Sequence, residues 1–243
     1  MIIDTHCHYD MFENPTQIIK DCEDNKTITI GMTNLPSHFE KGFPHIKGYR
    51  YIRMALGLHP LLAKEHSKEL VLFAKNVNKT SYIGEVGLDF SRNGITTKDI
   101  QIKSFNYILD KIRSNNKIVS IHSTRAETEV LEMLKHYKIK NAVFHWYSGN
   151  SIILKEIIDN GYYLSINPTM TKSQSGIKII SEMPLNRILT ETDSPYTKIS
   201  GRHTKPSDVT IVIDYLANKR GLSVKDVENE IYSNFRNLIN KIR

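Results

Sequence analysis

The chain has 243 residues, in which 33 lysines and arginines exceed 26 aspartates and glutamates by seven. This length fits one domain with its own core, expected over residues 1–243, and the basic balance favours a polyanionic partner. Cys7 and Cys22 are too few for a disulfide framework or a thiolate zinc site, and no leader-like or long apolar segment occurs, so we expect a protein of the reducing cytoplasm without a membrane segment.

Eight short runs rich in β-branched and aromatic residues alternate with segments of helical period. One such segment repeats apolar residues at 102, 105, 109 and 112, and another at 130, 133, 134 and 137, so each presents one apolar stripe to a sheet. Apolar strands separated by helices predict a parallel sheet covered on both faces, and eight units in this length predict a closed (β/α)8 TIM barrel rather than an open doubly wound sheet. The strands are expected at residues 2–6, 27–33, 51–59, 81–87, 117–123, 141–146, 162–167 and 187–193.

Single residues modify the expected helices. Residues 36–48 contain two prolines and two glycines, which predict a poor or broken helix. Thr96 and Ser223 each precede an aspartate by three residues and are expected to begin helices. Apolar residues at 224, 227, 231, 235 and 238 give the last segment an amphipathic helical pattern, so we expect this helix to pack on the barrel.

Polar residues that can bind metal ions stand at the C-terminal ends of six of the eight expected strands. In a barrel of this kind those ends converge on one mouth, which brings together residues that are distant in sequence. A single histidine there is more often a hydrogen-bonded residue, but a cluster of imidazoles and carboxylates without a cation would be a costly unpaired cavity. The residues are His6 and His8, His59, Glu85, His122, His145 and Asp193.

Six segments that carry these residues resemble, in order and across nearly the whole chain, the motif series of the TatD-family metal-dependent deoxyribonucleases. They are HCH (6–8), GLHP (57–60), GEVGLD (84–89), IHS (121–123), FHWYSG (144–149) and ETDSPY (191–196), and SNFRNL (233–238) resembles the closing helix of that family. The resemblance implies an amidohydrolase-like TIM barrel that hydrolyses phosphodiester bonds in DNA with two metal ions. It also implies which residues hold them: His6, His8 and Asp193 for one ion, His122 and His145 for the other, and Glu85 as the bridge.

The chain departs from the family pattern in two places. Trp146 and Tyr147 follow His145, where the family more often has a smaller residue and then phenylalanine, and Arg125 lies three residues after His122 rather than two. The segments 121–126 and 145–149 resemble the TatD-like member of the bacterial Qat antiphage systems. That resemblance implies a role in antiviral defence and further protein partners.

The residue types themselves suit hydrolysis of a phosphate diester by two metal ions. Two divalent ions about 3.5–4 Å apart can generate hydroxide near neutral pH and stabilise charge on the attacking and leaving oxygens. Glu85, which ends the fourth expected strand, is the candidate bridging ligand, and Asp193 is suited both to bind one ion and to act as general base. Imidazoles favour zinc, manganese, cobalt or iron, whereas magnesium prefers oxygen ligands. The identity of the metal therefore does not follow from the ligands, and we expect two ions of zinc, manganese or magnesium, or a mixed pair.

Contacts to the substrate are less specific in the sequence. His59 is either a phosphate contact or outer-shell donor, or the partner in a hydrogen bond at the rim. Arg202 and Lys205, with the cationic residues at 198 and 203, form either a phosphate-binding loop or a solvated one. Arg125 is a further cationic candidate. The aromatic pair at 146–147 either stacks on a terminal base or packs in the cavity wall.

Three functions are compatible with this sequence. The first is a metal-dependent deoxyribonuclease that removes nucleotides exonucleolytically, with single-stranded DNA or a DNA end as its substrate. The second is a metal-dependent hydrolase of another ester or amide bond, because the same barrel serves many substrates; Glu85 argues against the amide hydrolases that bridge their metals with a modified lysine. The third is a weakly active subunit of a defence complex, against which the intact set of ligands speaks. The oligomeric state stays open.

Overall fold

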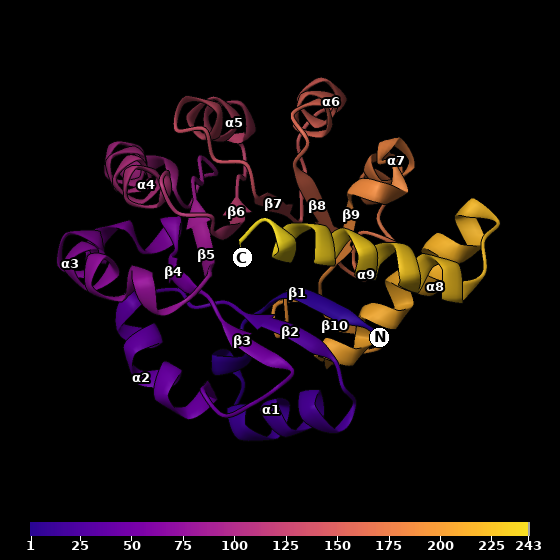
Figure 1. The fold of residues 1–243 in the computed structure, drawn as a ribbon. Helices are drawn as coiled ribbons and strands as arrows, with labels where there is room; N and C mark the ends of the chain where they lie inside the picture. The colour runs from indigo at the N-terminus through magenta and orange to yellow at the C-terminus, as the bar shows by residue number, and fades with distance from the viewer. Residues whose placement is uncertain (243) are drawn as a thin grey trace.

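The computed structural model describes residues 1–242, which form a ring of parallel strands surrounded by helices (Figure 1). Apart from β3, which runs on into β4, each strand of the ring is followed by a helix, and the strands within β1–β3 and within β4–β9 pair in parallel, so the predicted TIM barrel is confirmed. The strands of the ring are β1 (Ile3–Cys7), β2 (Ile28–Gly31), β3 (Ile52–Met54), β4 (Leu56–Leu58), β5 (Tyr82–Gly87), β6 (Ile118–His122), β7 (Ala142–His145), β8 (Tyr163–Ile166) and β9 (Ile188–Thr190), and β10 (Lys198–Ile199) and β11 (Arg202–His203) form a short antiparallel pair after β9. The helices are α1 (Pro15–Asp24), α2 (Pro36–Ile46), α3 (His66–Asn76), α4 (Lys98–Ile112), α5 (Glu127–His136), α6 (Ser151–Asp159), α7 (Gln174–Glu182), α8 (Thr210–Arg220) and α9 (Val224–Asn240).

The strand predicted at 51–59 is two strands, because its halves pair with different neighbours. β3 hydrogen-bonds to β2 and β4 to β5, and Ala55 between them donates its N–H to the carbonyl oxygen of Gly31 at 2.8 Å. In β4, a Cβ on Gly57 would lie 1.6 Å from the carbonyl oxygen of Thr33. That oxygen accepts the N–H of Glu85 at 3.2 Å. The close approach that glycine allows therefore fixes the backbone at Glu85.

The ring closes where the segment after β9 meets β1. Asp193 donates its N–H to the carbonyl oxygen of His6 at 2.8 Å, and His8 donates to the carbonyl oxygen of Ser194 at 2.7 Å. Cys7 and Ser194 form a parallel bridge between these bonds. The backbone of His6 and His8, at the start of the chain, is thus hydrogen-bonded directly to the backbone of Asp193 and Ser194, near its end.

A poor or broken helix is predicted at 36–48, but α2 is continuous over Pro36–Ile46, so the predicted break is wrong. Pro36 occupies the first turn of α2, where a missing N–H has no helical partner, and Pro44 lies in the last turn. α9 begins as predicted, because the hydroxyl of Ser223 accepts the N–H of Asp226 at 3.1 Å. Thr96 does not begin α4, which starts at Lys98 after a short 3-10 turn. Within residues 1–242, no helix has both the length and the apolar character needed to cross a bilayer.

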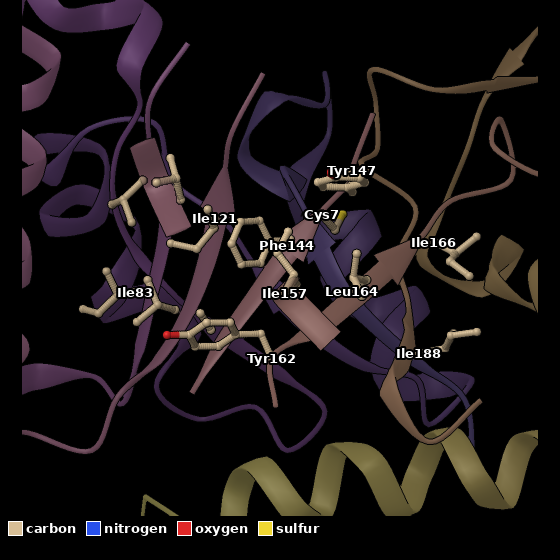
Figure 2. Packing of buried hydrophobic residues seen from close by; sticks show 14 of the residues in the cluster. Cys7, Ile83, Ile121, Phe144, Tyr147, Ile157, Tyr162, Leu164, Ile166 and Ile188 are labelled. Carbon is tan, nitrogen blue, oxygen red and sulfur yellow. The ribbon is translucent and has the colours of Figure 1, made fainter. Parts of the chain in front are cut away.

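Alternating strand residues divide the core into two layers. Phe144 and Leu164 belong to the layer between the strands and the outer helices (Figure 2), whereas Val143, next to Phe144, points into the ring. α9 lies across one end of the ring (Figure 1), and its Phe235 and Leu238 pack against the inner layer. This end of the barrel, from which the strands start, is therefore filled with apolar side chains.

We expect Ile231→Ala to lower the free energy of unfolding by about 2–5 kcal/mol, because Ile231 packs α9 against the core and its truncation leaves a cavity. Denaturant titration followed by circular dichroism measures this loss. Ile152→Ala is the matched control, since this isoleucine lies exposed on α6, and should change stability by about 0.5 kcal/mol or less. Equal losses in the two variants would contradict the packing of α9.

Candidate active site

The strands build the site because every second side chain points into the barrel. In β6, Ile118, Ser120 and His122 occupy alternating positions, and the same alternation in β7 leads to His145. Ile118 belongs to the apolar inner layer, and the hydroxyl of Ser120 lies 2.8 Å from Nδ1 of His6. The interior thus changes from apolar side chains to hydroxyls and then to imidazoles toward the C-terminal ends of the strands.

The carboxylate of Glu85 is the centre of this site and is almost fully buried. Imidazoles from several strands converge on both of its oxygens, so one acidic group faces five rings. The ring nitrogens are Nδ1 of His122 and Nε2 of His145, at 2.6 and 2.8 Å from Oε1, and Nε2 of His8, His6 and His59, at 3.1, 3.4 and 3.4 Å from Oε2.

The ligand atoms face one another in the way that ligands of shared cations do. Nε2 of His6 lies 3.1 Å from Nε2 of His8, and Oδ1 of Asp193 lies 3.6 and 3.7 Å from these two nitrogens. Two imidazole lone pairs at this distance repel unless a proton or a cation lies between them. Imidazoles mixed with carboxylates fit a divalent metal ion. Three sets of ligand atoms lie within 4.8 Å of one another: His6, His8 and Asp193; His6, Glu85 and His145; and His59, Glu85 and His122.

The charges of the site are coupled through Glu85. Burial opposes its ionisation, but the interactions with the imidazoles of His59, His145 and His122 outweigh burial and hold the pKa of Glu85 well below its usual range. Burial lowers the pKa of His145, and lowers that of His6 well below its ordinary value. Both rings are therefore neutral at physiological pH and have a lone pair to offer to a cation.

Asp89 holds the far side of the His122 imidazole. Its Oδ2 lies 2.8 Å from Nε2 of His122, while Nδ1 of the same ring faces Glu85. Burial opposes protonation of His122, but the hydrogen bonds to these two carboxylates raise its pKa to about 9. Because both ring nitrogens need a proton to donate to carboxylates, His122 is an imidazolium in the metal-free chain at neutral pH.

Sequence reasoning assigned no role to three buried carboxylates, of which Asp89 is one. Glu191 accepts the N–H of Trp146 at 3.1 Å, and Asp4 accepts the N–H of His6 at 3.1 Å. Burial raises the pKa of Asp4 to about 7 and that of Glu191 to about 8. Each lies two to four residues from a predicted ligand, which is the signal that inspection of the strand ends could have used.

A cavity of about 520 Å³ opens above Glu85. Leu61, Leu62 and Trp146 give it an apolar side, and the half-exposed Tyr196 stands at its rim. No lysine or arginine of residues 1–242 lines it. Charge inside the cavity is therefore set by imidazoles and carboxylates.

The predicted cationic contacts lie outside this cavity. Arg202 forms two hydrogen bonds to the carboxylate of Asp208, at 2.7 and 2.8 Å. Nζ of Lys205 lies 3.3 Å from Oδ2 of Asp21. Arg125 is exposed at the turn after β6. The structure thus brings none of the three to the cavity wall.

His59 and one of the two predicted aromatic residues do reach the cavity. His59 lines it, and Nδ1 of this ring accepts the N–H of Leu61 at 3.2 Å. Trp146 also lines it and is half-buried. Tyr147 is buried and donates its hydroxyl to the carbonyl oxygen of Asn150 at 2.8 Å. Tyr147 therefore packs in the wall, and the face available to a substrate is that of Trp146.

Comparison with known proteins supplies relatives over almost the whole chain. Residues 3–240 match the model of a family described as TatD related DNase. The putative deoxyribonuclease tatdn3 of Danio rerio is 28% identical, and the match covers 99% of this chain and 98% of the relative. An uncharacterized metal-dependent hydrolase of Methanocaldococcus jannaschii is 26% identical over 96% of this chain and 94% of its own. The crystal structure of the TatD homologue YjjV of Escherichia coli has a TM-score of 0.87 at 22% identity, covers 98% of this chain and 97% of its own, and so shares the fold.

We expect Asp89→Asn to weaken metal binding about 10- to 100-fold, because loss of a carboxylate behind a ligating imidazole has effects of this size. Equilibrium dialysis against buffered metal measures the affinity. Asp214→Asn, which changes an exposed carboxylate on α8, is the matched control and should bind as the unaltered chain does. If both variants bind equally well, Asp89 does not orient a ligand.

Metal binding should release protons, and this release should fall as the pH rises through about 9, the pKa of His122. Below that pH a cation at Nδ1 must displace a proton, whereas above it the ring is already neutral. Calorimetric titration in buffers of different ionisation enthalpy counts the protons. Asp89→Asn should release fewer at neutral pH, because it removes one of the two groups that raise the pKa. The same release on both sides of pH 9 would exclude His122 as a ligand.

Proposed function

The chain belongs to the family of TatD-related DNases, and from this premise we propose that it is a metal-dependent hydrolase that cleaves phosphodiester bonds in DNA. The observation that carries the proposal is the buried Glu85, whose two oxygens face five imidazoles at the mouth of the barrel. The names of its relatives, a putative deoxyribonuclease and a metal-dependent hydrolase, support both parts of it.

We infer that Glu85 bridges two divalent ions. Divalent ions in such a site act as Lewis acids and lower the pKa of water, which supplies a nucleophile near neutral pH. The many imidazoles favour zinc or manganese over magnesium. One ion would be held by His6, His8 and Asp193, the other by His122 and His145, and His59 would stand beside Oε2 of the bridge.

Asp193 is the proposed general base. It lines the cavity, and its Oδ1 lies 3.6 Å from Nε2 of His6. Burial, together with the negative charges of Glu85 and Glu191, raises the pKa of Asp193 well above its ordinary value. That shift applies to the metal-free chain; a divalent ion beside Asp193 would favour the ionised carboxylate, which would then accept the proton of an attacking water and return it to the leaving oxygen.

We further propose that the substrate is an end of DNA and that cleavage is exonucleolytic. A cavity of about 520 Å³ has the size of a small-molecule site, so it suits a terminal unit rather than a continuous duplex. The half-buried Trp146, with Leu61 and Leu62, offers apolar surface to a base. Within residues 1–242 no lysine or arginine lines the cavity, and this favours a second candidate function, hydrolysis of an uncharged ester or amide.

Other features stay predictions of the sequence. The resemblance of segments 121–126 and 145–149 to a TatD-like member of the Qat systems supports protein partners and a role in antiviral defence, and the cysteine count supports a cytoplasmic location. Substrate contacts by Arg125, Arg202 and Lys205 also stay predictions. The hydrogen bonds from Arg202 to Asp208 favour the alternative of a solvated loop.

The purified protein should shorten end-labelled single-stranded DNA only when divalent metal is present. Circular single-stranded DNA of the same sequence should stay intact, because it offers no end to the cavity. Gel electrophoresis with chelated and metal-supplemented samples measures both. Cleavage after chelation would refute metal dependence, equal cleavage of the circle would refute the exonucleolytic mode, and hydrolysis of a neutral ester without any of DNA would favour the second candidate.

Variants of the site belong to the same assay. Asp193→Asn should lose about 10²- to 10⁴-fold in rate, the usual contribution of a general base. Glu85→Gln should lose turnover altogether, because an amide has no charge with which to bridge two cations. Glu13→Gln changes an exposed glutamate and is the control, with unchanged turnover expected. Full activity of Glu85→Gln would remove Glu85 from the centre of the site.

A further inference from the structure

Nine lysines and arginines gather at the end of the barrel opposite the cavity. Five loops lead into β3, β5, β6, β7 and β9 at this end, and the segments 47–53, 77–82, 113–117, 137–141 and 183–188 contain no aspartate or glutamate. Without their nine cations the chain would have 24 lysines and arginines against 26 acidic residues, so these loops account for the whole net charge. The nine are Lys47, Arg50, Arg53, Lys79, Arg113, Lys117, Lys138, Lys140 and Arg187, and we call them the basic end.

Two grooves cross the basic end. The first, of about 390 Å³, lies between α2 and the end of α9 and is lined by Lys47, Arg53 and Lys79 with the half-buried Tyr82. The second, of about 270 Å³, lies between the loops before β6 and β7 and combines four cations with three amides: Arg113, Lys117, Lys138 and Lys140, and Asn115, Asn116 and Asn141. In the part of the chain that the structure describes, no acidic residue lines either groove.

Lys117 connects the two grooves. Its Nζ donates to the carbonyl oxygens of Val77 and Thr80, at 2.9 and 2.6 Å, and so ties the loop before β5 to the loop before β6. Thr80 lines the first groove and Lys117 the second. The grooves are therefore neighbours on one surface.

The cations of the basic end are largely without counter-ions. Among residues 1–242, only one of the nine cations has a carboxylate within 4.0 Å: Nε of Arg113 lies 3.2 Å from Oδ1 of Asp110. Lys241, at the end of α9, extends the set: burial lowers its pKa, and the like charges of Arg187 and Lys140 lower it further. Positive charge thus gathers at this end, whereas Arg202 and Lys205, in the segment after β9, each face a carboxylate.

We propose that the basic end binds the phosphate backbone of a nucleic acid, on the face of the barrel that points away from the cavity. Lysines, arginines and amide side chains along a groove are the groups that contact phosphates, and their affinity comes from the release of counter-ions. The cores of protein interfaces are instead depleted in lysine. Phe43, Ile46, Ile239 and Ile242 also line the first groove, but they are buried or half-buried, and none of the large apolar side chains exposed in residues 1–242, which insertion into a membrane would use, lines either groove.

This site goes beyond the proposed hydrolysis, because it shares no residue with the cavity. The basic end would bind phosphates along a nucleic acid, whereas the cavity would bind the phosphodiester that is cleaved. Affinity for long strands then depends on the basic end, whereas turnover of a small phosphodiester depends on Glu85 and its imidazoles.

The test is binding of a labelled oligothymidylate to the full chain in the presence of chelator, measured by fluorescence anisotropy across a salt series. The variant carries Lys47→Glu, Lys79→Glu and Lys140→Glu. The matched control carries Lys20→Glu, Lys103→Glu and Lys178→Glu, which change the net charge equally on the exposed faces of α1, α4 and α7. We expect the basic-end variant to bind at least about tenfold more weakly and to lose about two from the slope of log affinity against log salt, since each phosphate contact to a single strand contributes about 0.7.

Three further measurements complete the test: the control variant, the binding of other polyanions and the hydrolysis of a small phosphodiester. The control triple variant should retain the affinity and slope of the unaltered chain, and equal losses in both triple variants would overturn the proposal as an effect of net charge alone. Binding of vesicles with anionic lipid, or of polyglutamate, but not of oligothymidylate would overturn it in favour of another polyanion. Hydrolysis of bis(4-nitrophenyl) phosphate with added metal should be unchanged in both triple variants. If neither the unaltered chain nor either triple variant hydrolyses it, the proposed function fails. The anisotropy measurement of oligothymidylate binding still decides this inference.

Discussion

Burial of an ionised carboxylate among imidazoles is the constraint on which the rest of the structure depends. A charge removed from water is stable only with compensating charge nearby, and Glu85 receives it from five rings that four separate segments contribute. These rings meet only if the strands end at the same level. The strand ends are aligned by the close backbone approach at Gly57, by the ring closure at Asp193 and by the alternating inward side chains of β6.

The barrel separates its charges along its axis. A lysine beside Glu85 would pair with the carboxylate and repel any divalent ion, so a cavity meant for metal ions does better without fixed cations. The described wall contains none, and the surplus of lysine and arginine stands at the opposite end. Between the two ends lie the apolar inner layer and the side chains of Phe235 and Leu238. A substrate at the mouth and a polyanion at the basic end would therefore not compete.

Much of the fold could be predicted from period and length, because a strand buried on both faces and an amphipathic helix leave different patterns. The split at Ala55 could not, since it depends on which neighbour each half of the strand pairs with. α2 could not either, because the cost of a proline depends on its position in the turn.

The candidate site divides in the same way. Imidazoles at strand ends could be found because the barrel itself brings those ends together. Asp89 was missed because an acidic residue just beyond a strand has the same sequence pattern whether it faces solvent or His122. The partner of Lys205 is Asp21, nearly the whole chain away, and pairing of that kind leaves no trace in local sequence. Positive charge could be counted from composition, but its gathering at one end follows only from the direction of the strands.

The closure of the ring between β1 and the segment after β9 has a consequence for biosynthesis. The first two imidazoles are added to the chain by the eighth residue, but Asp193, whose N–H bonds to the carbonyl oxygen of His6, follows only after most of the chain. A nascent or partly folded chain therefore lacks a complete set of ligands. The candidate ligands come together only once the segment after β9 has closed the ring on β1.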